Sequence, residues 1–155
     1  MQPILNLWGK DKNMPKIKSA KLTIHSHIDN FDSAPEVNDT EYSALIKTTD
    51  NEIGIAYEET GEGGKLFCDI LVRGERVTVA RRGAICSTLV FEEGKEYGSI
   101  YEIPPYKFDM AVKTKRLKID LLPTGGTIDI LYEMNVGGAV KKSRMKITVS
   151  EVDQA

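Results

Sequence analysis

The chain has 155 residues, of which 41% are hydrophobic and 28% are charged, and its formal net charge is -2. A chain of this length forms about one domain and buries roughly two thirds of its unfolded surface without disulfides or metals. The small net charge excludes a strong non-specific attraction to nucleic acid or to an anionic membrane, so any partner must be recognised through a local site.

The beginning of the chain differs from the rest, because regular alternation of apolar and polar residues starts only at Pro15. We expect a flexible extension over 1–14, or a translation start at Met14, followed by a β-barrel domain over 15–150 and a tail over 151–155. No apolar run is long enough to span a membrane or to form the core of a signal peptide. The sequence therefore predicts a cytoplasmic protein with no membrane partner.

From Pro15 onward the apolar residues recur with a period of two, and the breaks between the alternating segments carry Gly, Asn, Asp or Pro. This pattern is typical of antiparallel strands, and no segment has the periodicity of an amphipathic helix. The predicted strands cover 17–28, 41–49, 52–59, 66–73, 76–82, 86–91, 99–103, 107–115, 117–122, 127–136 and 139–149.

Tight turns fix the pairing of several of these strands. Asp50-Asn51 joins two strands, and Gly74-Glu75 suits a two-residue turn whose first position needs a positive φ. Counting outward from Gly74-Glu75 places these residues opposite each other: Val72 and Val77, Ile70 and Val79, Cys68 and Arg81.

The last two hairpins are predicted in the same way. Across the loop 123–126, the expected pairs are Leu121 and Ile128, Ile119 and Ile130, Leu117 and Tyr132. Around Gly137-Gly138, the expected pairs are Ile128 and Ile147, Ile130 and Met145, Tyr132 and Ser143 on the apolar face, and Asp129 and Lys146, Glu133 and Lys142 on the charged face. Directly opposed side chains share a face, so we expect both charged pairs to form ion pairs. A contact between Asp129 and Arg144 would argue against this register.

Consecutive antiparallel strands leave exposed edges if they form an open sheet, and closure removes that hazard. We therefore predict an all-β fold with a single antiparallel meandering β-barrel. A two-sheet sandwich stays open as an alternative, since a period of two does not separate the two architectures.

Several short motifs follow one another in a recognisable order. They are Tyr57-Glu58-Glu59-Thr60, Arg81-Arg82-Gly83-Ala84, Val90-Phe91-Glu92-Glu93-Gly94-Lys95, Tyr101-Glu102-Ile103-Pro104, Val112-Lys113-Thr114, Ile130-Leu131-Tyr132-Glu133-Met134 and Met145-Lys146-Ile147. Over about residues 16–149 the chain resembles the YwiB-like family of uncharacterised bacterial proteins. The resemblance implies a calycin-like, lipocalin-type barrel in the bacterial cytoplasm, and it implies no known activity. The family typically continues with Thr-Pro-aromatic-Gly after Tyr-Glu, whereas this chain has Ile103-Pro104-Pro105-Tyr106, so no role of that threonine or glycine carries over.

No cofactor or metal site is predicted. His25 and His27 lie on one face of a strand, as a metal pair would, but no third ligand accompanies them, so we expect a solvent-facing pair. Cys68 and Cys86 lack the spacing of a zinc or redox site and lie on apolar alternating segments. We expect both to be small buried thiols.

The glycines of Gly61-Glu62-Gly63-Gly64-Lys65 suggest a phosphate loop, but the motif's spacing, its Ser or Thr and its following helix are missing. Two basic stretches, at 113–118 and 141–146, lack the interleaved aromatic residues of a single-strand nucleic-acid site, and we expect them to be a solvated face. No nucleophile motif is present. The sequence thus argues against nucleic acid as a partner and against a catalytic role, although an enzyme built at the barrel mouth stays open.

The candidate ligand-binding residues gather at one end of the predicted barrel. Arg81 continues the inward apolar row of its strand, and a charge there is costly unless it is paired. The candidates are Tyr57, Glu59, Arg81, Tyr101 and Tyr132, with Glu59 as the expected partner of Arg81. Two interpretations stay open: a structural ion pair that closes the barrel end, or a site for the anionic group of a small ligand whose apolar body enters the barrel. The wider alternative is a filled barrel that binds a protein or RNA through its surface. The oligomeric state is not predicted.

Overall fold

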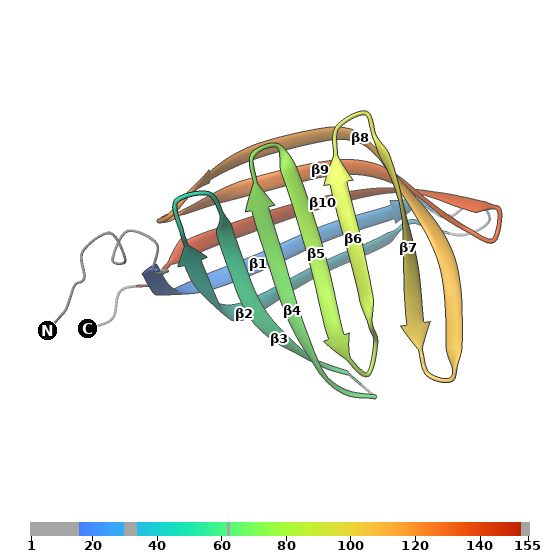
Figure 1. Ribbon diagram of the computed structural model, residues 1–155, viewed down its shortest axis with the longest axis horizontal. Coiled ribbons are helices and arrows are strands. Elements are labelled where there is room, and N and C mark those ends of the chain that lie inside the picture. Colours follow the sequence, from blue (N-terminus) through green and yellow to red (C-terminus); the bar gives the residue numbers. More distant parts are fainter. Residues whose placement is uncertain (1–15, 30–33, 62, 153–155) are drawn as a thin grey trace, which may run out of the picture.

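The computed structural model describes residues 16–29, 34–61 and 63–152, and these residues form an all-β fold (Figure 1). Within them there is no helix that is long and apolar enough to span a membrane. The predicted extension over 1–14 and most of the tail over 151–155 lie outside the described residues. The strands are β1 (Lys16–Asp29), β2 (Glu36–Thr48), β3 (Ile53–Gly61), β4 (Gly64–Arg73), β5 (Arg76–Gly83), β6 (Ser87–Glu92), β7 (Glu96–Ile103), β8 (Tyr106–Leu122), β9 (Gly125–Val136) and β10 (Ala139–Glu151).

The strands form a single sheet of ten strands in the order β6-β5-β4-β3-β2-β1-β10-β9-β8-β7. Every ladder is antiparallel, and β1 pairs with β10, so the first and last strands lie side by side. The sheet curls into a nearly closed barrel, which confirms the predicted class and excludes the sandwich (Figure 1). The break in the barrel wall therefore falls between the consecutive strands β6 and β7.

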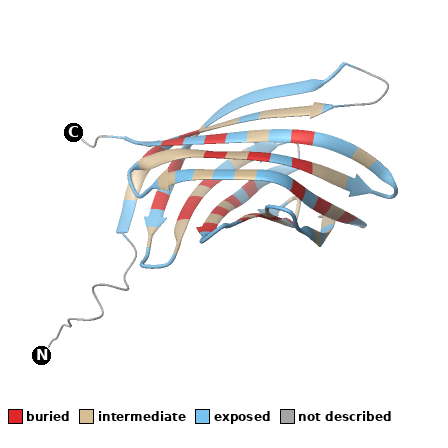
Figure 2. Ribbon diagram, turned by 90° about the horizontal axis from the view of Figure 1, so that it is seen from above, coloured by how far each residue is buried: buried red, intermediate tan, exposed pale blue. Residues whose placement is uncertain are grey.

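The inward face of the strands carries the hydrophobic core. Buried and more exposed residues alternate along the strands (Figure 2), as expected when one face of a sheet is buried and the other meets water. The largest fully buried side chains are those of Phe91, Leu22, Ile46, Ile55, Ile70, Ile128, Ile130, Ile147, Val77, Val112, Thr114 and Cys68. They fill the barrel with apolar side chains over much of its length.

Two of the predicted hairpin registers are confirmed. The ladders pair Val72 with Val77, Ile70 with Val79 and Cys68 with Arg81, and they pair Ile128, Ile130 and Tyr132 with Ile147, Met145 and Ser143. Gly74 and Gly137, the first residues of the two turns, have φ values of 60° and 59°. Positive φ at these positions costs glycine little, and this is why both turns close on two residues.

The register predicted across the loop 123–126 is wrong by two residues. The turn is shorter than expected, because Leu122 already pairs with Gly125 and Leu121 with Gly126. Ile119 consequently lies opposite Ile128 instead of Ile130. A shift of two residues keeps every side chain on its predicted face, so the inward assignment of these residues still holds.

The expected ion pairs of the last hairpin are also wrong, although its register is correct. Asp129 lies opposite Lys146 in the ladder but accepts hydrogen bonds from Arg144, at 3.2 Å to Nε and 2.8 Å to Nη2. Glu133 lies opposite Lys142 and pairs instead with Lys115 of β8, at 3.5 Å. Long side chains reach diagonal neighbours on the same face, so a contact between Asp129 and Arg144 does not contradict the register.

Three strands differ most from the prediction. The segments 107–115 and 117–122 form one strand, β8, whose ladder with β9 shifts between Thr114 and Arg116. This bulge interrupts the period of two, and the interruption made one bent strand look like two. β2 begins at Glu36 and β7 at Glu96, both earlier than predicted.

Thr114, beside this bulge, has a fully buried side chain whose hydroxyl oxygen has no hydrogen-bond partner. A buried hydroxyl without a partner is destabilising, whereas valine has nearly the same shape and no polar atom. We expect Thr114→Val to raise the free energy of unfolding by about 1 kcal/mol. Urea denaturation measures the change, and Thr78→Val, at a half-buried outward position of β5, is the control. A loss of stability in Thr114→Val would show that the hydroxyl is satisfied.

Candidate functional site

Arg81 is an arginine on the inward face of β5, near the end of the strand. It lies directly opposite Cys68 of β4, which in turn lies opposite Tyr57 of β3. Its Nε is 3.9 Å from Oε2 of Glu59, and the two side chains are 33% and 20% exposed. The structure thus brings Tyr57, Glu59 and Arg81 together at one end of the barrel.

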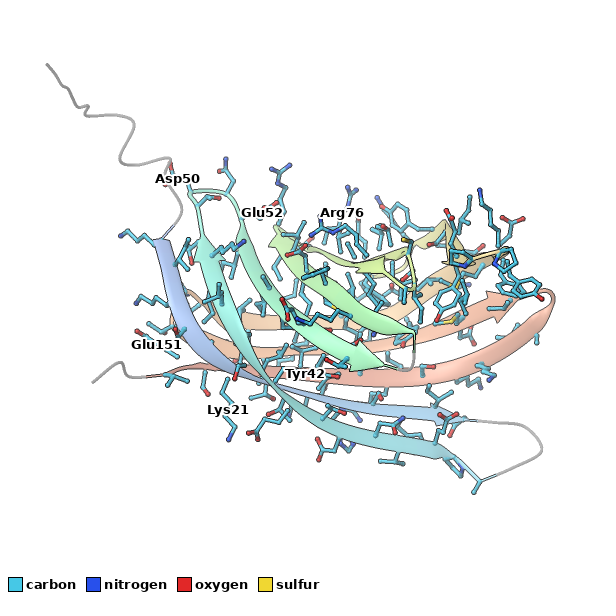
Figure 3. All side chains as sticks on the ribbon, turned by 90° about the horizontal axis from the view of Figure 1, so that it is seen from below. Lys21, Tyr42, Asp50, Glu52, Arg76 and Glu151 are labelled. Atoms are coloured by element: carbon cyan, nitrogen blue, oxygen red, sulfur yellow. The ribbon has the colours of Figure 1, made fainter. Side chains whose placement is uncertain are left out.

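Tyr42 is a member of this group that the sequence analysis missed. Its hydroxyl donates a hydrogen bond of 3.0 Å to Oε1 of Glu59, and its ring lies 4.8 Å from the ring of Tyr57. The side chain projects from β2, where Figure 3 labels it. Counting outward from Asp50-Asn51 places Tyr42 opposite Glu59, so the hairpin rule used for the other turns would have found it.

The surroundings of Arg81 are buried, and they hold the tyrosines and the cysteine in their neutral forms. Burial, together with Glu59, raises the pKa of Tyr57 above its usual range. Burial is also the main cause that raises the pKa of the Cys68 thiol. Burial raises the pKa of Tyr132, although Ser143 and Arg81 oppose the change. At neutral pH the charges of the group are therefore those of Arg81 and Glu59.

The two remaining candidates lie on strands at the far side of the break between β6 and β7. Tyr132 of β9 is buried, and its ring packs edge-on against Phe91 with 5.0 Å between ring centroids. Tyr101 of β7 is half-buried and pairs with Phe108. Both interact electrostatically with Arg81. The four other predicted candidates thus all interact with the guanidinium of Arg81.

The guanidinium of Arg81 is incompletely paired. Its Nε is buried and has no hydrogen-bond partner, because Oε2 of Glu59 lies beyond hydrogen-bond distance. The other oxygen of Glu59 accepts the Tyr42 hydroxyl. Burial lowers the pKa of Arg81, but Glu59, Tyr57 and Cys68 outweigh this effect and leave the pKa above its usual value. The site therefore holds a permanent cation with an unused donor.

The break between β6 and β7 lies next to this cation. Cys86 and Glu102 form an isolated antiparallel bridge at one end of the break, with backbone hydrogen bonds of 3.0 and 2.9 Å. At the other end, the turn that joins β6 to β7 is closed by a hydrogen bond from the backbone N–H of Lys95 to the carbonyl of Glu92. Between these points the described residues of β6 and β7 form no ladder. We call this stretch of unpaired strand edges the seam.

An open groove of about 770 Å³ follows the seam. The residues that line it come from β5 to β8 and from the loop between β5 and β6: Arg81, Arg82, Cys86, Ser87, Thr88, Val90, Gly98, Ser99, Ile100, Glu102, Asp109 and Met110. Arg81, Ser87, Ser99 and Met110 belong to the inward face, so the groove extends from the outer wall towards the interior. The sequence did not indicate this groove, since periodicity does not show which neighbouring strands fail to pair.

The two histidines lie away from this site, whereas both cysteines lie beside it. His25 and His27 are on the outward face, with side chains 52% and 45% exposed, as expected for a solvent-facing pair. Cys68 is a free, buried thiol, as predicted. Cys86 is free but only half-buried, because it lies at the edge of the seam, and the expectation of a buried thiol is wrong there.

The pKa of Tyr42 is raised to about 12 by burial and by its hydrogen bond to Glu59. The folded state therefore holds this proton more tightly than the unfolded state, so the contribution to stability is present below pH 10 and is lost as the pH rises towards 12. We expect Tyr42→Phe to cost about 1 kcal/mol at pH 8, through the lost hydrogen bond, and less at pH 11. Urea denaturation at both pH values checks this, with the exposed Tyr106→Phe as control. A cost that grows between pH 8 and pH 11 would contradict it.

Comparison with known proteins places the chain in a family. Residues 22–149 match the family described as "Domain of unknown function (DUF1934)". The fold is similar to that of the crystal structure of ywiB protein from Bacillus subtilis, with a TM-score of 0.83 and 24% sequence identity over 93% of this chain and 99% of that chain. No curated protein matches the sequence. The resemblance to the YwiB-like family is thereby confirmed, and the structural likeness extends to the fold.

Proposed function

This chain belongs to the DUF1934 family, a domain of unknown function, and we propose that it is a calycin-like binding barrel of the bacterial cytoplasm that takes up a small organic acid. The carboxylate of the acid lies at Arg81, just inside the barrel wall. Its apolar body lies in the groove along the seam. The proposal assigns a binding role and no catalytic step.

The buried Nε of Arg81 is the observation that carries this proposal. A guanidinium presents five N–H groups in a planar fork that matches a carboxylate, and hydrogen bonds to charged groups are among the stronger ones in proteins. A pair that served only to close the barrel end would gain from direct hydrogen bonds between its members. Here the partners are 3.9 Å apart, which leaves a donor for an acid.

The location of the ligand body follows from the packing of the interior. Phe91 is fully buried, with the Tyr132 ring against it, so apolar side chains already occupy the axis of the barrel. The groove beside Arg81 offers Val90, Ile100 and Met110 as apolar lining, together with hydroxyl groups. This combination of apolar lining and a few convergent polar groups is typical of small-molecule sites.

The second candidate function is an interaction module that binds a protein or RNA through its surface. The hairpin of β7 and β8 favours it, because the rings of Tyr106 and Phe108 stack at 6.5 Å and are 64% and 45% exposed. Exposed aromatic rings are common contact residues in protein and single-strand nucleic-acid interfaces. A macromolecule that copurifies without any small acid would support this candidate.

Native mass spectrometry of the purified protein and calorimetric titration with octanoate test the proposal. We expect the wild type to retain or bind an acid and Arg81→Leu to lose at least about tenfold in affinity, since a charge-assisted hydrogen bond contributes about 1.5–3 kcal/mol. Arg73→Leu removes an exposed arginine from the neighbouring strand and serves as the control. Circular dichroism verifies that both variants fold, and Arg81→Lys, which keeps the charge, recovers part of the affinity. Equal binding by wild type and Arg81→Leu contradicts the proposal, and so does a lack of binding to the wild type.

A further inference from the structure

The groove along the seam has oppositely charged sides. Arg81 and Arg82 line it from β5, and Glu102 and Asp109 line it from β7 and β8. Arg82 already binds Asp69 at 3.0 Å, so Arg81 is the cation that is free to receive a ligand. An acid held at Arg81 therefore extends towards two carboxylates.

These carboxylates have no cation of their own. In the described part of the chain, neither Glu102 nor Asp109 forms an ion pair. Lys107 lies opposite Glu102 in the ladder, whereas Asp109 lies opposite the uncharged Ile100. Asp109 also lies in the part of β8 that has no partner residue on β9, because that ladder begins at Met110. It is thus the more available carboxylate for a positively charged group of a ligand.

The seam between the charged sides presents backbone groups that lack a partner strand. Hydrogen-bonding directions alternate along antiparallel strands, and the bridge between Cys86 and Glu102 fixes which residues point across the break. They are Thr88 and Val90 of β6, and Gly98 and Ile100 of β7. All four line the groove. One of the backbone groups that point across the break, the carbonyl of Thr88, accepts a hydrogen bond from the Ser99 hydroxyl.

The dimensions of the groove limit the size of the ligand. β5 and β8 are separated by three strand spacings, or about 14 Å. The two side chains also point to opposite faces of the barrel wall, Arg81 inward and Asp109 outward. A single amino acid, whose charged groups are joined through one carbon atom, is therefore too short to touch both. A whole additional strand does not fit either, because the bridge between Cys86 and Glu102 holds one end of the seam closed. A molecule of two or three residues matches the remaining space.

We propose that the groove along the seam binds a short peptide with free termini. Its carboxylate lies at Arg81, its ammonium group lies at Asp109 with Glu102 nearby, and its peptide group bonds to the unpaired backbone of β6 and β7. This inference rests on the proposed function, which supplies the carboxylate at Arg81. It adds the recognition of a second charge and of an amide, and so names the class of acid.

Calorimetric titration with leucyl-leucine, its N-acetyl derivative, its C-terminal amide and free leucine tests the inference. We expect the free dipeptide to bind about tenfold more tightly than either blocked form, because each block removes one charge-assisted contact. Free leucine should bind more weakly than the dipeptide. In a variant that combines Asp109→Asn and Glu102→Gln, the preference for a free amino terminus should disappear, while affinity for the N-acetyl form stays unchanged. Asp120→Asn, on the same strand and remote from the groove, is the matched control.

The outcomes separate this inference from the proposed function. If the N-acetyl dipeptide and octanoate bind through Arg81 and the free amino terminus gives no advantage, the peptide inference is overturned and the proposed function stands. If the preference for a free amino terminus survives in the Asp109→Asn, Glu102→Gln variant, the inference is also overturned. If Arg81→Leu binds every acid as the wild type does, the proposed function fails, and the inference fails with it.

Discussion

Replacing Phe91 with alanine is expected to lower the free energy of unfolding by about 3–5 kcal/mol, the usual cost of removing a buried aromatic side chain from a core. Phe91 is fully buried on the inward face of β6, opposite Val77, and its ring packs edge-on against Tyr132 of β9. The substitution removes apolar surface from the core and leaves a cavity that the curved sheet closes only in part. Urea denaturation with circular dichroism measures the loss.

The position of Phe91 raises the cost above that of an average core residue. β6 is an end strand of the sheet and forms a ladder only with β5, so side-chain packing supplies much of what holds it against the rest of the barrel. The contact between Phe91 and Tyr132 joins β6 to β9, across the break in the sheet. Phe67→Ala is the matched control, because this ring is 46% exposed on the outer face of β4, and we expect it to cost about 1 kcal/mol or less. Equal losses in the two variants would contradict the assignment of Phe91 to the core.

The sequence predicts the fold well because hairpin turns of two residues leave little freedom. Gly74-Glu75 and Gly137-Gly138 each fix a register, and one-residue slips are excluded by the apolar residues that they would turn towards water. The same reasoning, from the sequence alone, makes Glu59 the expected partner of Arg81. It would also have placed Tyr42, because counting outward from Asp50-Asn51 sets Tyr42 opposite Glu59.

Other features could not be predicted, for physical reasons that differ. Side-chain periodicity says which residues share a face but not which neighbouring strands form hydrogen bonds, so the seam between β6 and β7 and its groove were missed. A long charged side chain is within reach of several oppositely charged residues on its face, so the register does not determine its partner. Asp129 accordingly binds Arg144 and not the opposed Lys146. The bulge between Thr114 and Arg116 changes the alternation itself, which divided β8 into two predicted strands.

The error at the loop 123–126 has a specific cause. Two consecutive glycines, Gly125 and Gly126, were assigned to the loop, since glycine is uncommon within strands. In the structure both belong to β9, with φ values of 132° and 148°, and only residues 123 and 124 form the turn. The absence of a side chain, and not the flexibility of a loop, is the reason for glycine at these positions.

Gly126→Ala is therefore expected to destabilise the protein by about 3 kcal/mol or more, because it combines backbone strain with a clash. The φ of 148° is one that residues with a side chain rarely adopt, and an added Cβ would collide with the backbone carbonyl oxygen of Asp120 on β8. Since the colliding atom belongs to the backbone of the paired strand, no rotation of a side chain relieves the contact. The alternative is a displacement of β8 against β9, which would break the ladder next to the turn.

The matched control for this prediction is Gly98→Ala. An added Cβ at Gly98 of β7 meets no atom within 4 Å, and its backbone is not in the positive-φ region. Alanine also loses less conformational entropy than glycine on folding, so we expect this control to be neutral or slightly stabilising. Urea denaturation of the two variants beside the wild type gives the comparison. If Gly126→Ala were as stable as Gly98→Ala, the close approach of β8 to Gly126 would be wrong, and the register that pairs Leu121 with Gly126 would have to give way to the one read from the sequence.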